Sequence, residues 1–89
     1  MKKITLDSGL DLTIDEEWLD DMEVLDLLIA IDKEEDPTAI ATLSDKILGK
    51  KQKKLVYDSL RTEKGRVPSK AFAECIQEIF NKLGDAGKN

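Results

Sequence analysis

Carboxylates are the side chains of this sequence that come closest to a catalytic set. Seven acidic residues occur from Asp15 through Asp26, where paired carboxylates could serve acid/base chemistry. The chain has no histidine, so its single cysteine, Cys75, lacks the usual activating base. Acids at the start of a helix are most often a solvated face, whereas a catalytic acid needs a perturbed, partly buried environment. We therefore predict that the protein is not an enzyme.

The loops do not match known ligand-binding motifs either. Residues 32–43 begin with Asp, as an EF-hand loop does, but Pro37 stands where that loop needs Gly and Leu43 where it needs Glu. The segment Gly49-Lys50-Lys51 lacks the strand and the upstream glycine of a phosphate-binding loop. We predict no metal site and no cofactor.

Charge is divided unevenly along the chain, whose net charge is −5. Residues 1–45 carry 3 basic and 14 acidic side chains, and residues 46–89 carry 11 basic and 5 acidic ones. The acidic half and the lysine cluster can attract each other within one chain or between copies. The residues predicted to mediate self-association are Glu16, Glu17, Asp20, Asp21, Lys50, Lys51, Lys53 and Lys54.

The lysine cluster also leaves a nucleic-acid alternative open. Lysines from Lys46 to Lys54 flank Gly49 with a spacing that resembles a helix-turn-helix. The sequence pI of about 4.7 and the negative first half would repel phosphate. Only Tyr57 is near enough to act as an aromatic platform for a base. These features disfavour DNA binding.

Residues 1–14 are predicted to form a β-hairpin. Apolar residues alternate with polar ones on both sides of Asp7-Ser8-Gly9, whose Gly suits a left-handed turn position. A lone hairpin is marginal in water, so its apolar face is expected to dock on helices while one edge stays free.

The next helix is predicted to begin after Asp15, an N-cap residue. Its apolar residues fall on two opposite stripes, so the helix is apolar nearly all round and should be buried on several sides. One stripe comprises Trp18, Met22, Leu25 and Ile29, and the other comprises Val24, Leu27 and Ile31. Either residues 24–31 lie at the centre of the core, or one face waits for a partner. The partner-binding candidates are Val24, Leu27, Ile31 and Trp18.

Three further helices complete the predicted fold. Asp36-Pro37 begins a short helix that Gly49 should end, and a third helix runs from the lysines to about Thr62. The turn Gly65-Arg66-Val67-Pro68 is expected to be a structural motif. It leads into a final amphipathic helix whose stripe is Phe72, Cys75, Ile76, Ile79, Phe80 and Leu83.

The whole is predicted to be one mainly α domain, a small bundle of about four helices with an N-terminal β-hairpin. The hairpin takes residues 1–14, the bundle residues 15–83, and a flexible tail residues 84–89, after a helix end at Gly84. Cys75 is expected to be an inert core residue. No apolar run is long enough for a membrane span and no signal peptide is visible, so an intracellular location is expected.

Several segments resemble the tail assembly chaperones of long-tailed phages and prophages of Gram-positive bacteria. The resemblance runs from about residue 18 to the C-terminus. The segments that carry it are Asp20-Asp21-Met22-Glu23, Asp36-Pro37, Leu48-Gly49, residues 63–68 and residues 83–89. Its most specific part is Gly65-Arg66-Val67-Pro68 together with the Gly87-Lys88-Asn89 ending.

The resemblance implies a non-catalytic protein that coats the tape measure protein, keeps it soluble and recruits tail tube subunits. It implies a place in the host bacterial cytoplasm and absence from the mature virion. Family members often have a longer form made by ribosomal frameshifting, for which codons at Gly87-Lys88-Asn89 could provide the slippery run. The alternatives are a small acidic adaptor or antitoxin-like protein, and a helix-turn-helix DNA-binding protein.

Overall fold

The computed structural model describes residues 1–86, and it begins with the predicted hairpin. Strands β1 (Lys2–Thr5) and β2 (Asp11–Ile14) pair antiparallel, with Ile4 opposite Leu12. Gly9 has a φ of 95° in the connecting turn, which is closed by a hydrogen bond of 2.8 Å from the Leu6 N–H to the Leu10 carbonyl. Ile4, Leu6, Leu12 and Ile14 are buried, so one face of the hairpin belongs to the core.

The predicted helix from Asp15 is wrong at its start. Residues Glu16–Asp20 form a short 3₁₀ helix, η1, and the chain is extended at Asp21 before α1 (Met22–Asp32) begins. Asp15 does cap η1, accepting a hydrogen bond of 3.0 Å from the Glu17 N–H, but Asp21 accepts one of 3.1 Å from Val24. An aspartate that bonds the backbone ahead of it favours a cap over a helix interior, so it divides the segment in two.

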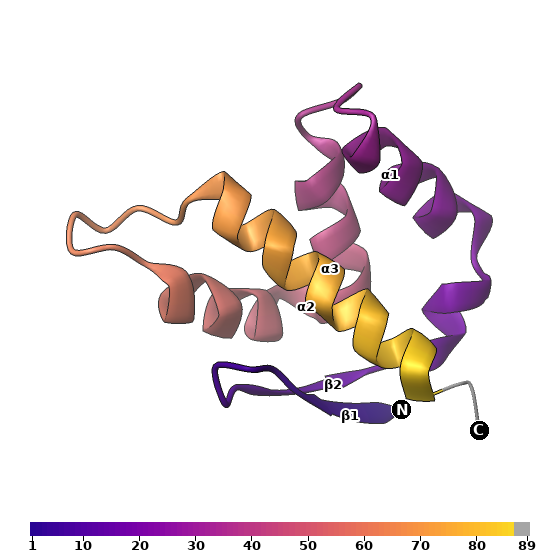
Figure 1. The fold of residues 1–89 in the computed structure, drawn as a ribbon, viewed down its shortest axis with the longest axis horizontal. Helices are drawn as coiled ribbons and strands as arrows, with labels where there is room; N and C mark the ends of the chain where they lie inside the picture. The colour runs from indigo at the N-terminus through magenta and orange to yellow at the C-terminus, as the bar shows by residue number, and fades with distance from the viewer. Residues whose placement is uncertain (87–89) are drawn as a thin grey trace.

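The predicted count of about four helices is also slightly off, because the structure has three α-helices. Helix α2 (Ala39–Leu60) includes Gly49, whose φ of 73° and ψ of 165° are not helical. Gly49 therefore redirects the helix without an intervening loop, and the two halves of α2 point in different directions (Figure 1). The turn that follows the second half projects from the body of the molecule (Figure 1), whereas Val56 of the second half is buried in the core. We call residues 50–68 the arm.

Helix α3 (Ser69–Ala86) carries the predicted apolar stripe, and all six of its members are buried. The Pro68 carbonyl accepts a hydrogen bond of 3.1 Å from the Phe72 N–H, so proline immediately precedes the helix. Gly84 does not end it as predicted, since its φ is not positive and the helix runs two residues further. Residues 87–89, with the Gly-Lys-Asn ending, lie outside the described residues.

The core joins all parts of the fold around α3, which crosses the middle of the molecule (Figure 1). Side chains of the hairpin, α1, both halves of α2 and α3 form one buried apolar cluster. The residues with no more than 1% exposure are Leu12, Ile14, Val24, Ala39, Leu43, Ser44, Val56, Ile79 and Leu83. None of the helices within residues 1–86 is both long enough and apolar enough to cross a membrane.

Side chains from α2 and α3 form hydrogen bonds with backbone groups on both outer edges of the hairpin. The sequence had predicted that one of these edges stays free. On β2, the Gln52 carboxamide accepts a hydrogen bond of 2.7 Å from the Thr13 N–H and donates one of 2.8 Å to the Thr13 carbonyl. On β1, the Lys82 ammonium donates one of 2.7 Å to the Thr5 carbonyl. Its hydrogen bond to Asp7, despite some loss of hydration, raises the pKa of Lys82. The hairpin is therefore held from two sides.

Helix α1 ends in a Schellman motif with an unusual residue at its left-handed position. The Glu34 N–H donates to the Ile31 carbonyl at 3.2 Å and the Glu35 N–H to the Ala30 carbonyl at 3.0 Å. Glu34 has a φ of 55°, which glycine adopts without penalty and other residues at a cost of about 1 kcal/mol.

We expect Glu34→Gly to raise the free energy of unfolding by about 0.5–1 kcal/mol. The substitution relieves the left-handed strain and removes a negative charge from the negative end of the helix dipole. Urea denaturation monitored by circular dichroism measures the change. Glu35→Gly is the control, because Glu35 has no positive φ and its replacement should not stabilise the protein. Equal effects of the two substitutions would contradict the assignment of strain to Glu34.

Candidate protein-binding groove

A groove separates α1 from α3. Two hollows, of about 300 and 340 Å³, lie between these helices and share Leu28, Asp32 and Gln77, so they form one continuous groove. Helix α1 contributes Leu25, Leu28, Ile29 and Ile31 to its walls, and α3 contributes Ala73, Ile76 and Phe80. The groove exists because α1 packs mainly on α2, which leaves its side facing α3 only partly covered. Its lining is mostly apolar, as in sites that hold apolar ligands or side chains.

An exposed apolar stripe of α1 adjoins the groove. Met22, Leu25 and Ile29 are spaced like one face of a helix and retain 67%, 40% and 49% of their accessible surface. They make up half of the six exposed large apolar side chains in the described part of the chain. Clustering of this kind is typical of surfaces that contact other proteins.

Acidic residues surround one end of the groove. Residues 15–26, which lead into and form the first half of α1, carry seven acidic side chains and no basic one, and none of these seven forms an ion pair within the described residues. At the other end, Lys33 and Lys70 lie near Asp32 and Glu74. The groove is thus apolar along its length, negative where α1 begins and mixed in charge where α1 ends.

The predicted partner-binding residues take different positions. Val24 is fully buried and offers no contact surface, whereas Leu27 and Ile31 are half-buried against the core. Ile31 lines the groove. Trp18 is half-buried and borders a hollow of about 380 Å³ with Asp15, Glu17, Asp20 and Asp21. The interpretation that residues 24–31 form the centre of the core therefore holds for Val24 and not for the whole segment.

The partner-binding candidates suggested by the sequence coincide only in part with the accessible residues of α1. Leu25 and Ile29, which are exposed, and Leu28, which is half-buried and lines the groove, were not among the partner-binding candidates. A helix that is apolar nearly all round is expected to be covered on two faces, one by its own chain and one by a partner. The spacing of its apolar residues does not show which of the two faces its own chain covers. The α3 wall gave no separate signal, because Ile76 and Phe80 belong to a core stripe and border the groove only through their edges.

Cys75, which the sequence predicts to be an inert core residue, is buried in α3, and this burial, with a smaller contribution from Glu78, raises the pKa of its thiol. A protonated, enclosed thiol is a poor nucleophile. Within residues 1–86, no group of three or more His, Cys, Asp or Glu side chains is arranged to hold a metal ion.

No protein-family model, curated protein or solved structure matches this chain. Any function must therefore be inferred from the surface of the molecule, where the groove between α1 and α3 is the main candidate site.

The lysine cluster does not pair with the acids of residues 15–36. Lys53 contacts Asp45 at 2.9 Å and lies 5.4 Å from the centre of the Tyr57 ring. Burial opposes its charge, but the hydrogen bond to Asp45 and the nearby Tyr57 outweigh it and raise the pKa of Lys53. Lys54 contacts Asp58 at 3.9 Å, while Lys50 and Lys51 are exposed without an ion pair in the described structure. If the lysine cluster pairs with the acids of residues 15–36, as the predicted self-association requires, it must do so between two copies of the chain.

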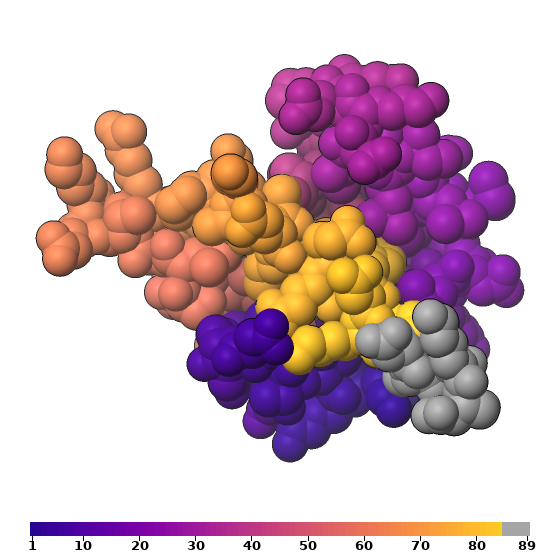
Figure 2. Space-filling view, viewed as in Figure 1, coloured from indigo at the N-terminus to yellow at the C-terminus, as the bar shows by residue number. Residues whose placement is uncertain are grey.

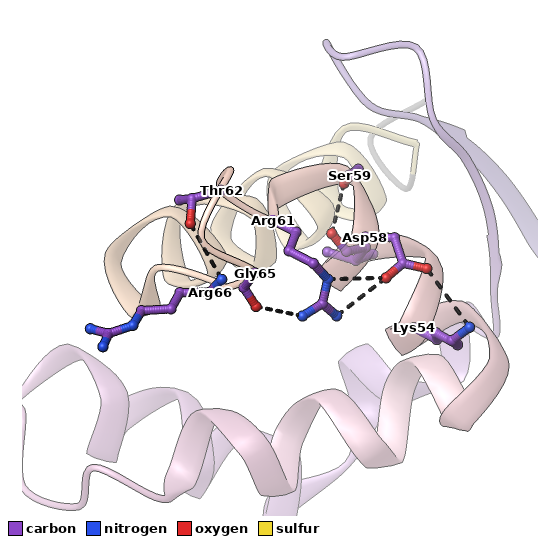
Figure 3. A network of polar contacts seen from close by, with 8 residues as sticks. Lys54, Asp58, Ser59, Arg61, Thr62, Gly65 and Arg66 are labelled. Carbon is purple, nitrogen blue, oxygen red and sulfur yellow. Dashed lines mark hydrogen bonds and ion pairs between the residues drawn. The ribbon is translucent and has the colours of Figure 1, made fainter.

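A compact network shapes the turn of the arm, residues 61–68 (Figure 3). Gly65 has a φ of 82°, and its carbonyl accepts a hydrogen bond of 2.8 Å from Arg61, which also contacts Asp58 at 3.2 Å. The Thr62 N–H donates to the Arg66 carbonyl at 2.7 Å. The predicted motif Gly65-Arg66-Val67-Pro68 thus includes a backbone position that suits glycine. The Arg66 guanidinium points away from the network.

The arm and the acidic segment lie on opposite sides of the molecule (Figure 2). The arm carries seven basic and two acidic side chains, a net charge of +5, whereas residues 15–36 have a net charge of −10. The uneven charge of the sequence therefore becomes an uneven charge in space.

Proposed function

We propose that the protein is a non-catalytic assembly chaperone that covers an apolar helical segment of another protein. The observation that carries the proposal is the groove between α1 and α3 with its adjoining stripe of Met22, Leu25 and Ile29. A chain with 37% charged residues that leaves such a surface open has a place to hold apolar side chains while it remains hydrated elsewhere.

The proposed client is the tape measure protein of a long-tailed phage or prophage, with tail tube subunits as later partners. This identification draws on the resemblance of residues 18–89 to tail assembly chaperones. The physical logic agrees with it, because many acidic copies bound along an apolar rod would mask its surface and repel one another. On this proposal the protein acts in the bacterial cytoplasm and leaves before the virion is complete.

Co-expression with the tape measure protein tests the proposal. The wild-type chain should keep the client in the soluble fraction and co-purify with it, whereas Leu25→Ser should reduce co-purification about tenfold, because a hydroxyl would replace a central apolar contact. Leu55→Ser is the matched control, since Leu55 is an equally exposed leucine, at 46%, located on the arm. Equal losses for both variants, or a client that stays insoluble with the wild type, would contradict the proposal.

Self-association is expected to accompany this function and to weaken with salt. Opposite charges at two ends of one molecule favour head-to-tail contacts, which build open chains more readily than closed dimers. Light scattering at about 50 mM and 500 mM salt measures the effect, because the Debye length falls from roughly 14 Å to roughly 4 Å between these concentrations. Replacing both Lys50 and Lys51 by glutamate should abolish the low-salt species. A wild-type monomer at both salt concentrations would contradict the expectation.

A further inference from the structure

The charges beside the exposed stripe of α1 indicate which client helix the groove would accept. We propose that the groove binds an amphipathic helix whose apolar stripe is flanked by lysine or arginine at the end that meets the start of α1. This inference rests on the proposed function and adds the chemistry of the client segment. It follows from the geometry of the stripe, the nature of the groove walls and the placement of the acids.

The helix that forms one wall of the groove is long enough to lie along a helical partner. Helix α1 has 11 residues and is therefore about 16 Å long, which corresponds to three helical turns of a docked partner. Both walls are helices, and apolar anchors at intervals of three and four residues are the usual way in which a third helix enters such a groove. A partner strand could form fewer backbone hydrogen bonds with the hairpin, because Gln52 and Lys82 already bond to backbone groups on its two edges.

Each exposed apolar residue of α1 has an acidic neighbour one helical turn away. Asp26 is four residues after Met22 and three before Ile29, and Asp32 is three residues after Ile29. Asp21 lies four residues before Leu25. Residues three or four apart are adjacent on a helix surface, so the stripe is bordered by carboxylates, and none of these three forms an ion pair within residues 1–86.

Basic side chains are confined to the opposite end of the groove. Lys33 follows the end of α1 and Lys70 lies in the first turn of α3; Asp32 and Glu74 line the same part of the groove, and Glu34, Glu35 and Asp36 come next in the chain. An apolar helix with acidic flanks would therefore meet like charges over the first two turns of α1, and a helix with basic flanks would meet opposite ones. Charge complementarity of this kind selects partners even when each exposed pair contributes little.

Two synthetic helical peptides with identical leucine stripes test the inference, one with lysines and one with glutamates at the flanking positions. Binding of each fluorescently labelled peptide to the full chain is measured by anisotropy. At about 50 mM salt the lysine peptide should bind about tenfold more tightly, and the ratio should shrink at 500 mM. Asp26→Lys should reduce the ratio to about threefold or less. Glu63→Lys, with the same change in net charge on the arm, should leave it near tenfold.

The outcomes separate this inference from the proposed function. Equal affinities for the two peptides, or lysine-peptide binding that survives Leu25→Ser, would overturn the inference, because the first shows no charge selection and the second shows charge attraction without the apolar stripe. Failure of both peptides to bind, while the tape measure protein is retained in a Leu25-dependent manner, would also overturn it and leave the function intact. Peptide binding that first requires dissociation of self-associated chains would identify a second copy as the occupant and overturn the inference as well.

Discussion

Replacing Ile79 by alanine is expected to lower the free energy of unfolding by about 3–4 kcal/mol. Ile79 is fully buried in α3, the helix around which the core is built, so its truncation removes apolar burial and leaves a cavity in a close-packed interior. Small domains have a net stability of only about 5–15 kcal/mol. The variant should therefore unfold at markedly lower urea concentration, which circular dichroism measures.

Ile29→Ala is the matched control, because it makes the same change in a helix at a position that retains 49% of its surface. Less apolar area is lost there, and alanine favours the helix, so we expect a loss below about 1 kcal/mol. The two variants should reverse their order in client binding, where Ile29→Ala has the larger effect. Similar losses of stability at both positions would mean that the stripe of α1 is part of the core, which would contradict the proposed docking surface.

Replacing Gly49 by alanine is expected to lower the free energy of unfolding by about 2–3 kcal/mol. Its φ of 73° and ψ of 165° fall in a region that is nearly restricted to glycine, and strain there costs about 1–3 kcal/mol. No atom lies within 4 Å of the position that a Cβ would take, so the cost is conformational and not a clash. Alanine also favours a straight helix at this position, which would carry Gln52 away from Thr13.

Gly84→Ala is the control for this prediction and should act in the opposite direction. Gly84 lies inside α3 with open space around it, so alanine should stabilise the helix by about 0.5–1 kcal/mol. Thermal unfolding of both variants measures the difference, which should exceed about 2 kcal/mol. Destabilisation by both substitutions would show that the effect at Gly49 is not a matter of its backbone conformation.

Sequence reasoning succeeded where one apolar face stood opposite a polar one. The hairpin and α3 have this character, and their buried residues were identified correctly because only one arrangement hides them. The start of α1 was misjudged because two aspartates, Asp15 and Asp21, are both good caps, and the chain uses both. Gly49 was correctly seen as an interruption, but its local effect, a bend and not a loop, depends on how the hairpin docks against the second half of α2.

The candidate groove could be predicted only in outline. That α1 has more apolar surface than one contact can cover follows from its sequence. Which stripe remains accessible depends on how α2 packs on α1, where Val24 is buried while Leu25 and Ile29 are exposed. The uneven distribution of charge was visible in the sequence, but the partners of the lysines were not. Lys53 and Lys54 form ion pairs with Asp45 and Asp58, which are near them in the chain, and not with residues 15–36.

The two hydrogen bonds between Gln52 and Thr13 also affect how the edge of the hairpin can behave at high protein concentration. A two-stranded sheet normally presents backbone groups to which an identical sheet can add, and repetition of that step seeds fibrils. Here a glutamine side chain substitutes for the next strand at the middle of β2, and a lysine does the same at the end of β1. These bonds disfavour strand addition at Thr13 and Thr5, so we expect the proposed self-association to use other surfaces than the hairpin.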